Sequence, residues 1–138
     1  MSVNSFEITI LGSSSAIPTT GRYPTAQVVN ALGRHFLVDC GEGTQIQIRK
    51  QKIGFAKIRN ILISHLHGDH YYGLIGLIST FNLLGLKKNI HIYSPSQLKD
   101  IIQPQLDFLK KDLQFDVIFH PLNFKKPQRI YNDQNVDV

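Results

Sequence analysis

The sequence contains a single cysteine, no run of about 18 apolar residues, and no tract rich in glycine and proline or in charge. The lone Cys40 excludes an intramolecular disulfide framework, and we interpret it as a small buried hydrophobe. Without a long apolar run, no membrane-spanning helix is expected. Residues 1–5 lack the basic start of a signal peptide and lead directly into an alternating pattern. Together these absences predict a cytoplasmic protein with no membrane partner.

The residues that are present indicate one globular domain with an anionic partner. A length of 138 residues is typical of a single domain, and a hydrophobic content of 42% is enough for a core. Lysine and arginine number 15 against 10 acidic residues, so the formal net charge is +5. A basic surplus suits nucleic acid, although many basic proteins bind none.

Hydrophobic periodicity predicts alternating strands and helices, and therefore a mixed α/β (α+β) fold. The expected strands are residues 6–11, 26–31, 34–40, 58–64, 89–93 and 114–120, with a hairpin over 129–138. Helices are expected over 44–52 and 70–84, and a third takes Ser94 as its N-cap and kinks or ends near Pro104. The strand at 58–64 is mostly apolar, as is typical of a central strand covered on both faces.

A dense group of metal-binding residue types follows that central strand. His65, His67, Asp69 and His70 lie within the sequence SHLHGDH at residues 64–70. In extended backbone, residues two apart point to the same side, so His65 and His67 can face one metal ion. Imidazole and carboxylate ligands without cysteine favour a catalytic zinc or a related divalent metal such as manganese over a closed structural zinc site. The alternative, a polar surface loop, fits poorly between a buried strand and an apolar helix.

Two pairs of ligands suggest two metal ions. Such a pair activates a water molecule as hydroxide and stabilises the entering and leaving oxygens of a phosphoryl displacement. The expected chemistry is therefore hydrolysis, and Asp69 could both bind metal and accept the proton of the nucleophile.

Several segments carry a resemblance to a known family. The cluster SHLHGDH resembles the HxHxDH signature of the metallo-β-lactamase superfamily. FLVDCGEGTQIQ at residues 36–47 and ILGSSSAIPTTGRYPTAQVV at residues 10–29 are similar to ribonuclease Z, the endonuclease that removes the 3′ trailer from precursor tRNA. The loop PTTGR departs from the more basic versions of that family. The resemblance implies an αββα sandwich, of which this chain would supply about the first half.

The resemblance also implies roles for individual residues. His65 and His67 would bind one zinc ion, Asp69 and His70 would bind a second, and Asp69 would be the proton acceptor. Asp39 would support the ligand loop, although a carboxylate that caps the next turn is an equal alternative. Ser64 would shape the backbone beside the ligands. The family also suggests a homodimer.

Other ligands of the family have no counterpart in the sequence. The next histidine ligand of the family would fall just beyond Val138. His91 and His120 match segments that carry no ligand, and we interpret both as structural. We therefore expect residues 1–138 to be the N-terminal part of one metallo-β-lactamase-like domain, truncated before the remaining ligands and inactive alone.

Five basic residues lie between the first expected helix and the metal motif. They could contact an RNA backbone, or they could form an ordinary solvated face; they are Arg49, Lys50, Lys52, Lys57 and Arg59. Three functions remain open at this point. The chain could belong to a precursor-tRNA endonuclease, to a hydrolase of a small phosphodiester or sulfate ester, or to a non-catalytic module that dimerises.

Overall fold

The computed structural model describes residues 6–123 and 125–138, so the expectation for residues 1–5 lies outside the described part. Six strands form one sheet in chain order, and β1 to β3 pair antiparallel whereas β3 to β6 pair parallel. The strands are β1 (Phe6–Gly12), β2 (Ala26–Ala31), β3 (Arg34–Val38), β4 (Ile58–Leu62), β5 (Ile90–Ser94) and β6 (Val117–Pro121). The helices are α1 (Thr44–Lys50), α2 (Leu74–Leu83) and α3 (Gln97–Leu109). The predicted mixed α/β fold is confirmed.

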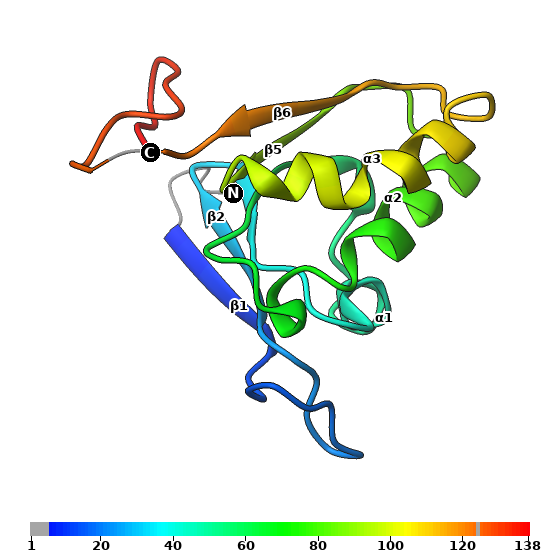
Figure 1. Cartoon of the computed structure of the whole chain (residues 1–138). Coiled ribbons are helices and arrows are strands. Elements are labelled where there is room, and N and C mark those ends of the chain that lie inside the picture. The colour runs from blue at the N-terminus through cyan, green and yellow to red at the C-terminus, as the bar shows by residue number, and fades with distance from the viewer. Residues whose placement is uncertain (1–5, 124) are drawn as a thin grey trace.

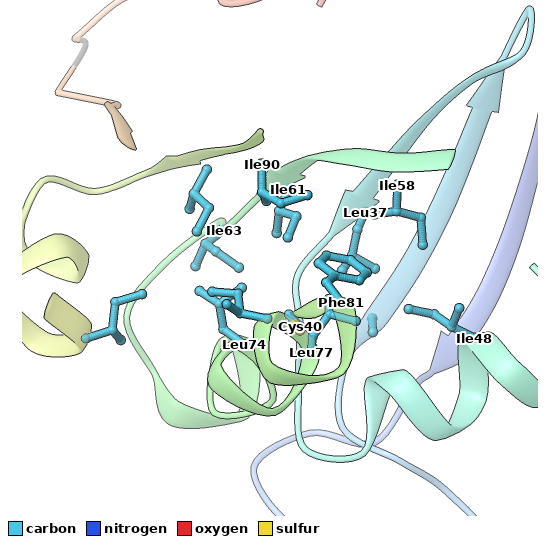
Figure 2. Close-up of a cluster of buried hydrophobic side chains, with 14 of the residues drawn as sticks. Leu37, Cys40, Ile48, Ile58, Ile61, Ile63, Leu74, Leu77, Phe81 and Ile90 are labelled. Carbon is cyan, nitrogen blue, oxygen red and sulfur yellow. The ribbon is translucent and has the colours of Figure 1, made fainter. Parts of the chain in front are cut away.

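The three helices connect the parallel strands and gather on one side of the curved sheet (Figure 1). The sheet contributes Leu37, Ile61 and Ile92, which pair across β3, β4 and β5 and are fully buried. Phe81 of α2 and Ile48 of α1 meet this layer from the helical side (Figure 2). Burial of apolar surface between helices and sheet therefore fixes the carboxyl ends of β3 and β4, which lead into the loops described below.

The opposite face of the sheet is covered only in part. Tyr131 packs edge-on against Phe36, with ring centroids 5.0 Å apart, and Arg34 pairs with Asp133 at 2.6 Å. The main-chain N–H of Asn135 and the Arg34 guanidinium hold the pKa of Asp133 well below its usual range. In Figure 1 this C-terminal segment (red) lies away from the helices. Three side chains of β1 on this sheet remain exposed, namely Phe6, Ile8 and Ile10.

Several predicted boundaries are wrong. The helix predicted over 70–84 begins at Leu74, because the carbonyl oxygen of His70 accepts from Cys40 and the N–H of Leu74 bonds to Tyr71 instead. The third helix begins at Gln97, after Ser96, whereas Ser94 ends β5. Residues 129–138 form no regular strand, but the antiparallel bridge between Asn132 and Asp137 and reciprocal main-chain bonds between Tyr131 and Val138 make the predicted hairpin in a shorter form.

The third helix continues through Pro104 to Leu109, contrary to the prediction that it could end there. Proline removes the N–H that would bond to the carbonyl oxygen four residues earlier. That residue, Asp100, is exposed, so water can satisfy its carbonyl group. Ile102 and Leu106 are buried on either side of the proline and hold the helix against the core. No helix among the described residues is long and apolar enough to cross a membrane.

Two histidines pair across the parallel strands β5 and β6. Nδ1 of His91 lies 2.9 Å from Nε2 of His120, and the ring of Tyr93 stacks on His120 with centroids 4.5 Å apart. Burial, with His91 as the second cause, lowers the pKa of His120. This arrangement is a packed polar pair and agrees with our structural interpretation of both residues.

The His120 environment predicts an acid-sensitive step in stability. Because the folded state disfavours protonated His120, the unfolded chain binds the proton more readily, and the unfolding free energy falls as the pH drops below the unfolded pKa of about 6.5. We expect chemical denaturation to show a smaller loss between about pH 7.5 and about pH 5.5 for His120→Phe than for the unchanged chain. His35→Phe is the control, and an equal reduction in both variants would contradict the assignment to His120.

Candidate metal centre

The predicted ligands lie at the carboxyl end of the parallel strands. His65 and His67 follow β4 directly, and Asp69 and His70 belong to the 3₁₀ turn Gly68–His70. The carboxyl ends of parallel strands are the usual place for a binding site in open α/β sheets. The structure thus brings the whole motif to one edge of the sheet.

A buried carboxylate orients one of these histidines. Asp39 is 6% exposed, and its Oδ2 lies 2.8 Å from Nδ1 of His70. An ionised carboxylate only accepts hydrogen bonds, so Nδ1 of His70 is the protonated nitrogen and Nε2 keeps its lone pair. A histidine whose far nitrogen is held by a carboxylate is the usual arrangement of a metal ligand.

Ser64 extends this network to a second histidine. Its main-chain N–H and its hydroxyl both donate to Oδ1 of Asp39 at 2.9 Å. Since the single hydroxyl hydrogen goes to the carboxylate, Oγ accepts from Nδ1 of His65, 3.1 Å away. Nε2 of His65 is then also free to bind a metal ion. Among the described residues, Asp39 makes these contacts and no side-chain bond to the turn that follows it.

The backbone around Asp39 is unusual and firmly held. Asp39 has a φ of 59°, in the left-handed region that side chains other than glycine rarely adopt. Its N–H bonds to the carbonyl oxygen of Leu62, and the next N–H, of Cys40, bonds to that of His70. A non-glycine residue in this region costs about 1–3 kcal/mol and persists only where its surroundings enforce it. This backbone conformation turns the Asp39 carboxylate away from β3 and toward Nδ1 of His70.

Close packing of small residues completes the loop. A Cβ atom on Gly73 would lie 2.0 Å from the carbonyl oxygen of Gly41, and one on Gly41 would lie 2.6 Å from that of Asp69. Cys40 beside them is fully buried (Figure 2), and burial raises its pKa to about 12. The interpretation of Cys40 as a buried hydrophobe is confirmed, and its thiol is not available as a thiolate ligand.

Asp69 accepts a hydrogen bond from the loop that follows β1. The N–H of Ala16 donates to its Oδ2 at 2.9 Å. This bond is the main reason that the pKa of Asp69 is lowered, so the carboxylate is ionised at neutral pH. Nothing in the sequence marked Ala16, because a main-chain donor leaves no signature in residue type.

The four predicted ligands lie beside one another. The ring centroid of His65 lies 4.7 Å from that of His67 and 3.7 Å from that of His70. On the far side of His70, its Nε2 lies 3.5 Å from Oδ2 of Asp69. Imidazole and carboxylate are the donors that zinc takes in hydrolases, so the residues fit zinc in chemistry. Among residues 6–123 and 125–138, however, no three His, Cys, Asp or Glu side chains converge closely enough to hold a metal ion.

The five basic residues differ in their surroundings, and Lys52 and Lys57 line one hollow. Arg49 and Lys50 at the end of α1 lie over the rings of Phe55 and Tyr23, at 5.7 Å and 5.4 Å. Lys57 and Arg59 lie at the start of β4, at the sheet edge opposite the histidines. The contact of the five residues with an RNA backbone stays a prediction.

Comparison with known proteins assigns the chain to a family. Residues 6–113 match the family model described as Anti-Pycsar protein Apyc1. The chain belongs to this family. A ribonuclease Z from Bacteroides thetaiotaomicron is 49% identical over 133 residues, which are 96% of this chain and 42% of that protein. The chain thus spans less than half the length of this curated relative.

Solved structures agree with the sequence comparison. Human tRNase Z, short form, superposes with a TM-score of 0.76 at 39% identity, over 83% of this chain and 44% of that one. The metallo-β-lactamase fold protein YhfI from Bacillus subtilis superposes with a TM-score of 0.67 at 18% identity, over 91% and 48%. The predicted metallo-β-lactamase fold and the resemblance to ribonuclease Z are confirmed.

Proposed function

We propose that this chain is part of a zinc-dependent endoribonuclease that removes the 3′ trailer from precursor tRNA. The observation that carries the proposal is the contact between Asp39 and Nδ1 of His70, which leaves Nε2 facing Asp69. The relatives named ribonuclease Z and tRNase Z supply the substrate class. The excess of basic residues suits an RNA substrate.

In this proposal His65 and His67 hold one zinc ion, and Asp69 and His70 hold the second. Bound zinc supplies a lowered pKa for water and stabilisation of charge on the phosphoryl oxygens. Asp39 keeps the ring of His70 in one tautomer and one orientation, and Ser64 does the same for His65. Asp69, ionised because Ala16 donates to it, accepts the proton of the nucleophile.

The four ligands of this proposal come from one short segment, and among the described residues no three such side chains converge closely enough to hold a metal ion. We therefore propose that turnover requires further ligands from outside these 138 residues, and that the chain alone is inactive. A chimera that joins the chain to the remaining sequence of the Bacteroides relative tests this directly. The substrate is a precursor tRNA labelled in its 3′ trailer.

We expect the chimera to release the trailer and the chain alone to leave the precursor uncut. His65→Ala in the chimera should abolish cleavage and reduce bound zinc measured by mass spectrometry, whereas His35→Ala should change neither. His35 is the matched control because it lies at the turn between β2 and β3, away from the motif. Hydrolysis of bis(p-nitrophenyl) phosphate without cleavage of the precursor would favour a small phosphodiester as substrate and sink the RNA assignment.

We also propose that the protein forms a homodimer through the outer surfaces of α2 and α3. A cavity of about 520 Å³ between these helices is lined by Ile75, Pro104 and Phe108, and Phe108 is 85% exposed. Leu83 near the end of α2 is 83% exposed. Exposed apolar side chains on this scale are typical of interaction surfaces.

Light scattering during size exclusion tests the dimer. We expect Phe108→Glu to shift the protein to the mass of a monomer, because a charge would have to be buried in the interface. Ile8→Glu, which replaces an exposed apolar residue on β1, is the control and should leave the dimer intact. A monomeric mass for the unchanged protein at high concentration would contradict the proposal.

A further inference from the structure

A basic cavity lies at the end of the sheet opposite the metal motif. Its volume is about 490 Å³, and its lining includes Arg59, Asn60, Lys87, Lys88, Asn89 and Tyr131. Arg59 is near the start of β4, and the two lysines directly precede β5, the neighbouring parallel strand. Almost thirty residues separate Lys87 and Lys88 from Arg59 in the sequence, and the pairing of β4 with β5 brings them together.

The charge of this cavity is uncompensated. Arg59, Lys87 and Lys88 are its cations, and no Asp or Glu lines it. In the part of the chain that the structure describes, none of the three lies within 4.0 Å of a carboxylate, whereas Arg34 and Arg129 pair with Asp133 and Asp137. Three unpaired cations around one hollow form a site for an anion.

Arg59 adds a second observation. Its Nη1 is buried and has no hydrogen-bond partner among residues 6–123 and 125–138. Burial also lowers the pKa of Arg59, so its guanidinium is partly removed from water. A buried donor without a partner carries a desolvation cost that an incoming acceptor would offset. Guanidinium matches the oxygens of a phosphate in geometry as well as in charge.

Neutral donors surround the cations. The side-chain oxygen of Asn89 accepts the N–H of Asp116 at 3.0 Å, which leaves the Asn89 amide hydrogens free for an acceptor. Lys87 and Lys88 are exposed at the rim, where they can follow a chain of charges that extends past the cavity. The volume is also large for a single inorganic phosphate. These features favour an extended polyanion over a small one.

We propose that this cavity binds a backbone phosphate of the RNA whose cleavage site lies at the metal motif. This inference rests on the proposed function for the identity of the RNA and names a second point of contact with it. Arg59 and His65 are six residues apart along an extended strand, or about 20 Å. An A-form RNA helix places successive base pairs about 3 Å apart along its axis, so an arm of about seven base pairs spans this distance.

Binding of a fluorescein-labelled RNA hairpin to the chain itself, measured by anisotropy across a salt series, tests the proposal. The double variant Lys87→Gln/Lys88→Gln should bind about tenfold more weakly. Its plot of log affinity against log salt should be shallower by about 1.5, because two phosphate contacts are lost. Arg59→Gln should also weaken binding, and it tests the cavity independently of the rim.

The matched control is Lys110→Gln/Lys111→Gln. It removes the same two charges from an adjacent pair of exposed lysines, and Lys110 lines a different cavity that also contains Asp107 and Asp116. We expect this control to keep the affinity and the salt slope. Equal losses in both double variants would show that only net charge matters and would overturn the proposal.

Two other outcomes would also overturn it. One is the absence of hairpin binding by the unchanged chain, and the other is displacement of the hairpin by equimolar pyrophosphate, which would assign the cavity to a small polyphosphate. Because binding is measured without cleavage, the proposed function can fail separately. A chain that binds the hairpin through Arg59 while the chimera leaves precursor tRNA uncut would keep the cavity as a nucleic-acid site and reject the nuclease.

Discussion

Asp39→Asn is expected to weaken zinc binding to the metal motif by about 10- to 100-fold, the usual effect of removing a carboxylate that orients a histidine ligand. Asparagine has nearly the same shape and also tolerates a positive φ, so the backbone at 59° should persist. What changes is the charge that accepts from Nδ1 of His70 and from both donors of Ser64. Isothermal titration of the chimera with zinc chloride measures the affinity.

A second measurement does not depend on zinc. Nitrogen-15 NMR of the histidine rings should show His70 protonated at Nδ1 in the unchanged chain and a mixture of tautomers in Asp39→Asn. Asp116→Asn is the control, because this exposed carboxylate lies at the opposite end of the sheet, before β6. Unchanged zinc affinity and an unchanged His70 tautomer in Asp39→Asn would show that the carboxylate does not orient the ligand.

Phe81→Ala is expected to lower the free energy of unfolding by about 3–5 kcal/mol. Phe81 is fully buried, packs edge-on against Phe55 with centroids 6.1 Å apart, and attaches α2 to the sheet. Because neighbouring side chains relax only partly around the missing ring, the cost includes a cavity as well as the lost burial. Urea denaturation followed by circular dichroism gives the value.

Phe6→Ala is the corresponding control. Phe6 is 69% exposed on β1, so the same truncation should cost well under about 1 kcal/mol. A loss in Phe81→Ala no larger than in Phe6→Ala would contradict the packing of α2 on the sheet. If Phe81→Ala fails to fold, Phe81→Leu, which keeps most of the apolar volume, should still unfold at lower urea concentration than the unchanged chain.

Six strands were predictable because each combines apolar residues with a turn signal at its end. Leu32 and Gly33, for example, both take positive φ in the tight turn between β2 and β3. Helix starts were not predictable to the residue. The carbonyl oxygen of His70 accepts from Cys40, 30 positions away in sequence, and this long-range contact keeps a helical bond from forming before α2. The hairpin predicted over 129–138 is present in a shorter form, with its turn over residues 133–136. The Arg34–Asp133 pair and the Phe36–Tyr131 contact hold it against β3.

The metal motif was recognisable from residue type and spacing alone, and the structure gathers its four members at one edge. The hydrogen bonds that orient His70 and keep Asp69 ionised were harder to predict. Asp39 could equally have capped the next turn, and only its positive φ directs the carboxylate toward His70. Ala16 acts through its main chain, and the cavity around Arg59 depends on which strands are neighbours. Spacing in the sequence predicts local geometry. It does not predict contacts between residues that only the pairing of distant strands brings together.

The hydrogen bonds of Cys40 have a consequence for how the motif meets its metal. Its N–H bonds to the carbonyl oxygen of His70 and its own carbonyl oxygen accepts from Gly73, while the N–H of the preceding Asp39 bonds to Leu62 at the other end of the segment. The ligand segment is therefore closed into a ring by peptide contacts that exist before any ion arrives. The entropy of shaping it is spent during folding, so little remains to be lost on binding. Folding alone therefore fixes the backbone of the segment that carries the four predicted ligands.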